Sequence, residues 1–145
     1  MKLIRTLSTI VLLLAALSFY LQAEERPLLT ATVPFAFDVA NVNLPAGSYT
    51  VSILPPYNTI KVQSADGRKA ATISAIPSQK SVNSERAKLV FHRFGNEYFL
   101  AQVWEQGSNI HRDLQSGNRA RQLARSGDRM ESVTILANAT KDGSH

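Results

Sequence analysis

The sequence predicts an all-β domain, a seven-stranded antiparallel sandwich or partly open barrel with one short helix in its C-terminal half. Two observations lead to this prediction: short segments that alternate apolar and polar residues, and turn residues spaced between them. The length of 145 residues suits a single domain. The chain has no cysteine, which excludes disulfides, thiolate metal sites and cysteine nucleophiles.

The first 23 residues have the pattern of a secretory signal peptide. Lys2 and Arg5 form a basic start, an apolar run covers residues 10–17, and Ala23 is a small residue at the expected cut. The alternative is an uncleaved membrane anchor, but the run is shorter than the roughly 20 residues that a spanning helix needs. We therefore expect an exported protein, periplasmic or extracellular, whose single β-rich domain covers residues 24–145.

Two N-terminal segments, residues 32–39 and 48–53, alternate apolar and polar side chains with the period of two that a half-buried strand requires. Pro34 has no N–H to donate, so the first strand is expected at an edge of the sheet. The LPAG sequence at residues 44–47 predicts the turn between these strands, because proline fixes φ and glycine tolerates positive φ.

The next hairpin is predicted from its turn. Asp66-Gly67 is the strongest two-residue hairpin signal, and as the central pair it sets the register of residues 60–73. That register brings apolar pairs together on one face and polar pairs on the other: Ile60–Ile73 and Val62–Ala71 against Lys61–Thr72 and Gln63–Ala70. Residues 77–86 are mostly polar and are predicted to form a surface loop.

Residues 88–104 predict a central hairpin that is covered on both sides, because both faces of its strands carry bulky side chains. A three-residue loop over residues 95–97 is preferred to a two-residue loop, since it separates a wholly apolar face from a mixed one. The apolar face then consists of Leu89, Phe91, Phe99, Ala101 and Val103. The mixed face consists of Val90, His92, Phe94, Tyr98, Leu100, Gln102 and Trp104.

The C-terminal part predicts a loop, a short helix and a closing strand. A helix is expected over residues 118–126, with Ser116 or Asn118 as its N-cap and Gly127 as its end. Residues 132–137 predict the seventh strand, and residues 138–145 a polar tail.

Several segments together resemble a family of small exported bacterial proteins. The resemblance is found at residues 34–39 (PFAFDV), 44–51 (LPAGSYTV), 88–100 (KLVFHRFGNEYFL) and 103–104 (VW). It implies export and a β-rich domain. The family has no established activity, so the resemblance supplies no ligand and no catalytic residue.

The residue patterns of common enzymes are missing from the sequence. No Gly-x-Ser-x-Gly motif is present, and no glycine-rich phosphate loop precedes a helix. His92 is interpreted as a strand histidine packed against aromatic residues, and His111 as an exposed loop histidine beside Asp113. Two internal histidines at this spacing do not make a zinc site. We therefore expect no catalytic residue, metal or cofactor, and a protein that is not an enzyme.

Basic residues gather in one segment. The formal charge is +5, and it falls to +3 when Lys2 and Arg5 leave with the signal peptide. The segment at residues 111–129 contains four candidate anion-binding side chains: Arg119, Arg121, Arg125 and Arg129. They predict either an anionic-surface binder or a solvated face with cations near a helix C-terminus. Export makes a nucleic-acid partner unexpected.

The mixed face of the central hairpin supplies the candidate ligand site. Its members are Tyr98, Trp104, His92 and Phe94. Aromatic rings with a few polar groups are typical of surfaces that recognise apolar or sugar-like ligands, although the 118–126 helix or a second copy of the chain could cover this face instead.

The leading hypothesis for the function is a non-catalytic exported binding or structural module of the cell envelope. Its partner would be a ligand or a second copy of the chain. An anionic-surface binder and an enzyme with an unrecognised site are the alternatives. Contact with a membrane is expected only through the signal peptide before cleavage.

Overall fold

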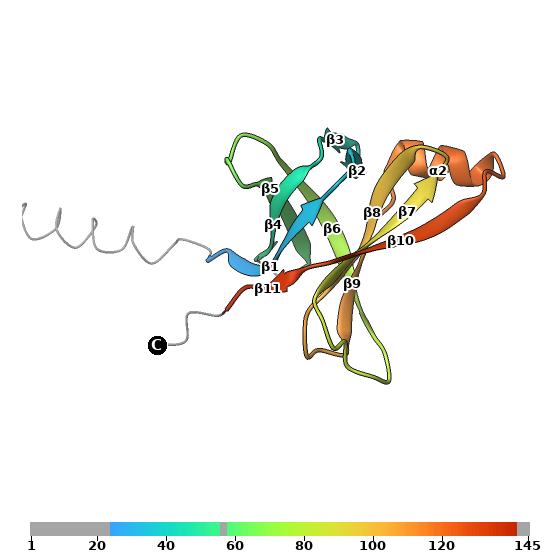
Figure 1. Cartoon of the computed structure of the whole chain (residues 1–145). Coiled ribbons are helices and arrows are strands. Elements are labelled where there is room, and N and C mark those ends of the chain that lie inside the picture. Colours follow the sequence, from blue (N-terminus) through green and yellow to red (C-terminus); the bar gives the residue numbers. More distant parts are fainter. Residues whose placement is uncertain (1–23, 56–57, 142–145) are drawn as a thin grey trace, which may run out of the picture.

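The computed structural model describes residues 24–55 and 58–141 (Figure 1). The predicted signal peptide, residues 1–23, and residues 142–145 of the predicted tail lie outside the described residues. Among the described helices, none is long and apolar enough to cross a membrane.

Eleven strands and one short helix build the described part of the chain. The strands are β1 (Arg26–Val33), β2 (Phe37–Val39), β3 (Val42–Leu44), β4 (Gly47–Leu54), β5 (Thr59–Ser64), β6 (Ala70–Gln79), β7 (Lys88–Phe94), β8 (Glu97–Trp104), β9 (Ile110–Leu114), β10 (Met130–Leu136) and β11 (Asn138–Ala139). The helix, α2, covers Asn118–Arg125. The all-β class with one short helix is confirmed. The number of seven strands was wrong, because one predicted strand is divided and three short strands were not predicted.

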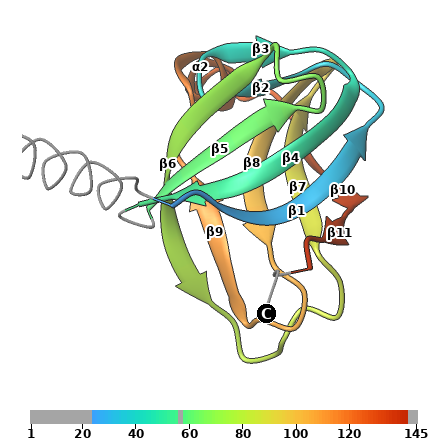
Figure 2. The same cartoon turned by 90° about the vertical axis from the view of Figure 1, so that its left-hand side faces the viewer.

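The strands form one coiled sheet in the order β10-β7-β8-β9-β6-β5-β4-β1-β11 (Figure 2). The two ends of this sheet are linked covalently, since β10 continues through Ala137 into β11, which pairs with β1. The second half of β1 makes no ladder with β10, so the coil is a partly open barrel. β2 and β3 pair with each other across one end of it, and β2 pairs in parallel with β8 at Asp38–Phe99.

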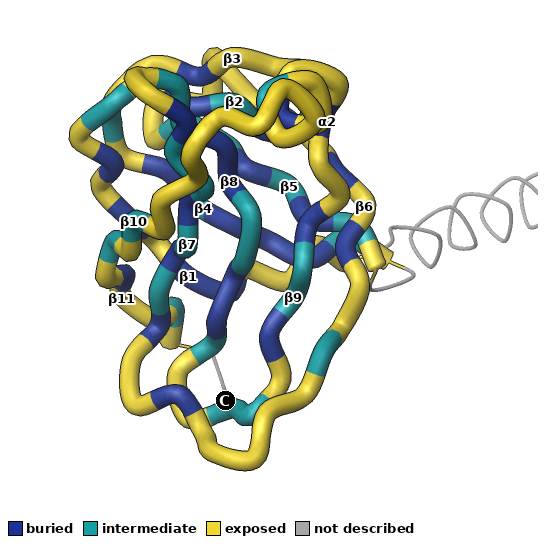
Figure 3. The backbone as a smooth tube through the Cα atoms, turned by 90° about the vertical axis from the view of Figure 1, so that its right-hand side faces the viewer, coloured by how far each residue is buried: buried dark blue, intermediate teal, exposed yellow. Residues whose placement is uncertain are grey.

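Buried residues recur along the strands of the coil (Figure 3), and their apolar side chains form one interior cluster. The largest fully buried side chains are Phe37, Phe91, Leu29, Leu44, Ile53, Ile60, Leu89, Val33, Val39, Val51, Val62 and Val103. Phe37 meets Tyr49 and Phe91 edge to face, at centroid distances of 5.1 and 5.3 Å. The hydroxyl of Tyr49 donates to the carbonyl of Pro45, which ties the LPAG turn to this aromatic cluster. Burial raises the pKa of Tyr49.

The β5–β6 hairpin has the predicted register. Ile60 pairs with Ile73, Val62 with Ala71, Lys61 with Thr72 and Gln63 with Ala70. In the turn, Gly67 has a φ of 73°, and the Oδ1 atom of Asp66 accepts hydrogen bonds from the Ser64 hydroxyl and the Arg68 N–H. These two donors lower the pKa of Asp66.

The strand predicted over residues 32–39 is interrupted at its proline. β1 ends at Val33 and β2 begins at Phe37. Because Pro34 cannot donate to a ladder, the chain bends there and crosses the end of the barrel. Phe35, in the bend, is half-buried and stacks on Tyr98 at 3.8 Å.

The loop predicted over residues 77–86 begins later than expected. β6 extends through Gln79 and pairs with β9, which was not predicted; Ser78 lies opposite His111 in this pair. β9 has the sequence IHRDL, and its buried positions are His111 and Leu114. A strand that buries a histidine and carries Arg112 and Asp113 has no clear apolar alternation, so its sequence resembles a loop.

The central hairpin, β7–β8, has a two-residue turn at Gly95-Asn96. Phe94 therefore pairs with Glu97, and Phe91 with Leu100. One extra residue in β8, Ala101, then forms a bulge that restores the predicted pairing of Leu89 with Val103. The predicted three-residue loop was therefore wrong. The strand pairing that it predicted is correct only on the far side of the bulge, where Leu89 pairs with Val103. As a result, Phe99 does not join Leu89, Phe91 and Val103 in the interior.

The predicted polar tail begins with a strand. Asn138 and Ala139 form β11 and pair with β1. Ala137 is buried and donates its N–H to the carbonyl of Ala87 at 2.9 Å. The first tail residues therefore hold the end of β10 against β1.

Candidate functional site

The central hairpin buries a second set of side chains on the face that points away from the barrel interior, which we call the outer face. Phe94 and Phe99 meet there at a centroid distance of 6.0 Å, and both are buried. α2 covers them with Ala120 and Leu123. Phe94, a predicted ligand-binding residue, therefore lies beneath the helix.

The start of α2 is fixed by the β2–β3 turn. Gly117 is the N-cap residue, and a Cβ atom at this position would lie 1.9 Å from the carbonyl oxygen of Ala40. The N–H of Asn118 donates to the side-chain oxygen of Asn41 at 2.9 Å. The predicted caps, Ser116 and Asn118, were wrong, because a residue distant in the sequence takes this role and the tight contact requires glycine.

The end of α2 agrees with the sequence prediction, and Arg119 connects the helix with β8. The helix ends before Gly127, the predicted end, which has a positive φ of 78°. Arg119 donates two hydrogen bonds to the Glu97 carboxylate, at 2.8 and 2.9 Å. This contact lowers the pKa of Glu97 and raises the pKa of Arg119.

Trp104 lies at the other end of the outer face and is 5% exposed. The imidazole of His111 stacks on its indole at 4.0 Å with an interplanar angle of 6°. The ammonium groups of Lys80 and Lys88 lie 4.9 and 4.7 Å from the indole centroid. The interpretation of His111 as an exposed loop residue was wrong, since it is a buried strand residue, 5% exposed.

A chain of hydrogen bonds connects Trp104 with the middle of the outer face. The indole N–H donates to Gln102 Oε1 at 3.0 Å, and Gln102 Nε2 donates to Asp113 Oδ1 at 2.7 Å. Asp113 Oδ2 accepts from the Ser78 hydroxyl at 2.5 Å and lies 3.4 Å from His111 Nε2. Side chains from β6, β8 and β9 thus converge on one carboxylate.

A pocket of about 220 Å³ opens between this carboxylate and α2. Its lining comes from β2, β7, β8, β9 and the start of the helix: Asp38, Ala40, His92, Phe99, Leu100, Ala101, Gln102, Asp113, Leu114, Gln115, Ser116, Gly117 and Ala120. Burial lowers the pKa of His92, although the nearby Asp113 carboxylate opposes this effect. The imidazole is therefore neutral at neutral pH.

Tyr98 is the one predicted ligand-binding residue that the structure separates from the other three. It pairs with Arg93 and packs against the interior cluster through its stack on Phe35. The guanidinium of Arg93 lies 5.4 Å from its ring centroid. The two-residue turn places Tyr98 on this side of the sheet, whereas the predicted three-residue loop placed it with Trp104.

The four predicted anion-binding arginines do not form one group. Arg119 is paired with Glu97, and Arg129 Nε lies 4.0 Å from a carboxylate oxygen of Glu131. Arg121 donates to Asn118 within α2. Arg121 and Arg125 make no ion pair with any residue in the described ranges.

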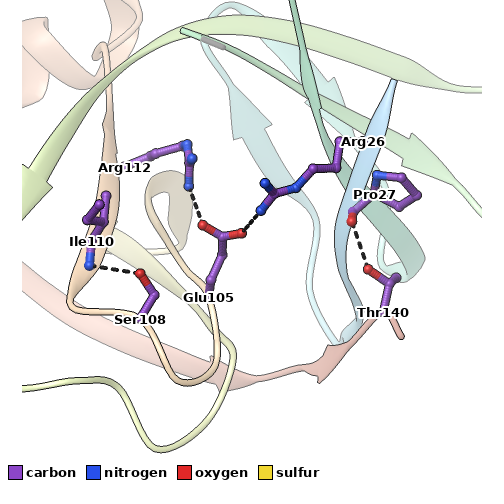
Figure 4. A network of polar contacts seen from close by, with 7 residues as sticks. All are labelled: Arg26, Pro27, Glu105, Ser108, Ile110, Arg112 and Thr140. Carbon is purple, nitrogen blue, oxygen red and sulfur yellow. Dashed lines mark hydrogen bonds and ion pairs between the residues drawn. The ribbon is translucent and has the colours of Figure 1, made fainter. Parts of the chain in front are cut away.

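Arg112, in the same basic segment, has a structural position at the other end of the barrel (Figure 4). Its Nη1 atom lies 2.8 Å from Glu105 Oε2, and Arg26 Nη2 lies 2.6 Å from Glu105 Oε1. The side chains of Arg112 and Glu105 are only 12% and 18% exposed. This network connects β1 with the β8–β9 loop.

The polar side chains of the outer face are hydrogen-bonded to one another. The Ser78 hydroxyl donates to the Asp113 carboxylate and not to an imidazole. Across residues 24–55 and 58–141, no three His, Asp or Glu side chains lie close enough together to hold a metal ion. The geometry suits binding by shape, charge and hydrogen bonds.

Comparisons with known proteins give no match: no family model, no curated protein and no solved structure is significantly similar to the chain. The resemblance of residues 34–104 to small exported bacterial proteins therefore stays a prediction.

Sequence reasoning found half of the outer face and missed the rest. Trp104, His92 and Phe94 were predicted from the pattern of the central hairpin, and all three lie on this face. Asp113 and Ser78 were missed, because β9 and the end of β6 were interpreted as loops. The available signal was the spacing of two residues between His111 and Asp113. In a strand this spacing puts both side chains on the same face.

Proposed function

We propose that the mature chain is a non-catalytic binding module of the cell envelope that takes a small polar ligand into the pocket between β8 and α2. The observation that supports this proposal is the pocket itself, whose lining combines polar side chains such as Gln102 and Asp113 with apolar ones. Its walls are held by specific polar contacts, among them those of Asn41 with Asn118 and of Gln102 with Asp113. Pre-formed concave sites with a few convergent polar groups are typical of ligand binding.

The charges around the pocket favour a ligand that carries an ammonium group. Asp38 and Asp113 both line it, and none of its lining residues is lysine or arginine. His92 adds no positive charge at neutral pH, because burial lowers its pKa. The Asp113 carboxylate is 40% exposed although it accepts two hydrogen bonds, so it has room for a further donor.

Ethanolamine tests the pocket directly. Binding to the folded state stabilises it by an amount that grows with the logarithm of one plus the ratio of ligand concentration to Kd. We therefore expect the melting temperature to rise with ethanolamine concentration, beyond the rise given by sodium chloride at equal ionic strength. Asp113→Asn should remove the increase, whereas Asp128→Asn, at an exposed position after α2, should keep it. An equal response of the wild type and Asp113→Asn would overturn the proposal.

Export belongs to the same proposal and is tested separately. N-terminal sequencing of the processed protein is expected to begin at Glu24, since the basic start and short apolar run of residues 1–23 are typical of a cleaved signal peptide. A membrane-retained product that keeps Met1 would contradict it.

A second candidate function is binding to an anionic membrane surface. Two arginines on α2, Arg121 and Arg125, are exposed, four residues apart and without a carboxylate partner among the described residues. Cosedimentation with phosphatidylglycerol vesicles should weaken steeply with salt and in the Arg121→Gln, Arg125→Gln double variant. Binding that salt does not change would count against this candidate.

A further inference from the structure

Three basic side chains lie against the indole of Trp104. His111 stacks on one face, with nearly parallel rings 4.0 Å apart. The ammonium groups of Lys80 and Lys88 also lie within 5 Å of the indole centroid. Two like charges therefore lie close to a single aromatic ring.

The positions of both lysines are set by backbone contacts. Lys80 follows β6 directly, and its N–H donates to the carbonyl of Asn109 at 2.9 Å. Lys88 is the first residue of β7 and pairs with Trp104 across the hairpin. The loop between them is tied to the β8–β9 loop, because Ser84 donates to Ser108 and Gly107 donates to Ser84, each at 2.8 Å. The sheet and its loops thus fix the backbone from which both lysine side chains extend.

Neither lysine has a carboxylate partner within the described ranges. Two nearby acidic groups are already engaged: Glu105 pairs with Arg26 and Arg112, and Asp113 accepts from Ser78 and Gln102. The indole stabilises an ammonium group through its quadrupole, but it cannot neutralise two of them. The repulsion between Lys80 and Lys88 is left uncompensated by the protein.

We propose that Lys80, Lys88 and Trp104 form a second binding site, separate from the pocket under α2, for an oxyanion such as a phosphate or carboxylate group. An oxyanion between the two ammonium groups would accept a charge-assisted hydrogen bond from each of them. Lysine is suited to this role as a compact point charge with three donors. The indole forms the apolar floor of the site.

Trp104 is the only tryptophan of the chain, so its fluorescence reports on the site. Inorganic phosphate, titrated against sodium chloride at equal ionic strength, is expected to change the emission of Trp104 in a saturable way. The Lys80→Gln, Lys88→Gln double variant should lose about tenfold or more in phosphate affinity, because both charge-assisted bonds are removed. Lys69→Gln, in the exposed β5–β6 turn, is the matched control and should bind like the wild type.

Two further arms identify the origin of the signal. His92→Gln, which changes the pocket under α2, should leave the phosphate response unchanged; its loss would mean that the pocket and not the lysine pair binds phosphate. Phosphatidylglycerol vesicles replace inorganic phosphate in the second arm. A lysine-dependent response to vesicles alone would assign the oxyanion to a lipid headgroup, and a response to both would assign it to phosphate in general. Equal affinities of the wild type and the double lysine variant for both probes would overturn the proposal.

Discussion

Both faces of the central hairpin bury large side chains, but the groups that surround these side chains differ between the two faces. On the interior face, Leu89, Phe91 and Val103 are fully buried among other apolar side chains. On the outer face, Trp104 and His111 are almost as buried, but the groups around them are two lysines, an amide and a carboxylate. The interior therefore depends on apolar area and close packing, and the Trp104 end of the outer face on directed polar contacts.

This difference separates a stabilising region from a candidate binding region. An apolar interior has no use for titratable groups, since a buried charge without a partner is costly. The outer face collects such groups and leaves a pocket between them. Substitutions on the two faces should consequently differ in size and in kind.

The largest effect is expected for Phe91→Ala. Phe91 is 0% exposed and meets Phe35 and Phe37 edge to face, so truncation should lower the free energy of unfolding by about 3–5 kcal/mol. Chemical denaturation measures this loss. On the outer face, Val90→Ala is the matched truncation of a half-buried residue, and a loss there equal to that of Phe91→Ala would contradict the contrast between the faces.

A smaller effect is expected for Gly117→Ala. The added Cβ would lie 1.9 Å from the Ala40 carbonyl oxygen, so α2 or the β2–β3 turn must move, at a cost of about 2–3 kcal/mol. Ethanolamine binding should be weakened as well, because both elements line the pocket. Gly107→Ala is the control for a glycine-to-alanine substitution. A Cβ at residue 107 would lie in open space, so this variant loses stability only through the positive φ of 74° at that position.

Gln102→Ala should cost less again. The substitution removes the acceptor of the Trp104 indole N–H and one donor of Asp113, a loss of about 1–2 kcal/mol. Denaturation followed at Trp104 measures both the stability and the change in indole environment. An unchanged emission spectrum would show that the hydrogen bond does not persist in solution.

The smallest effect is a dependence of stability on pH. Burial lowers the pKa of His92 below its ordinary value of 6.5, so the unfolded chain binds a proton more readily than the folded one. His92 should therefore reduce stability as the pH falls below about 6.5, and the reduction should disappear in His92→Gln. Melting temperatures between about pH 7.5 and about pH 5 test the direction.

The sequence predicted the fold where alternation and turn chemistry agreed. The β5–β6 register follows from Asp66-Gly67 together with alternating apolar residues, and both signals are local. The central hairpin was predicted only in part. The bulge at Ala101 allows a two-residue turn and the apolar pairing of Leu89 with Val103 to occur in the same hairpin, and no local sequence pattern indicates a bulge.

The candidate site was harder to predict for the same physical reason. Asp113 and His111 belong to a strand that owes its place to pairing with β6 and β8, and its own sequence is mostly polar. The N-terminal contact of α2 comes from Asn41, far away in the chain. Such features depend on tertiary contacts, which a single sequence does not reveal.

The most direct test of the central claim, that the outer face binds a ligand while the interior only stabilises the fold, is the NMR titration of the His92 ring with ethanolamine. We expect a saturable shift of the His92 resonances and a further decrease of the His92 pKa, because a bound ammonium group disfavours the imidazolium. Asp113→Asn should abolish both effects. His92 resonances and a His92 pKa that stay unchanged at saturating ethanolamine would contradict the claim.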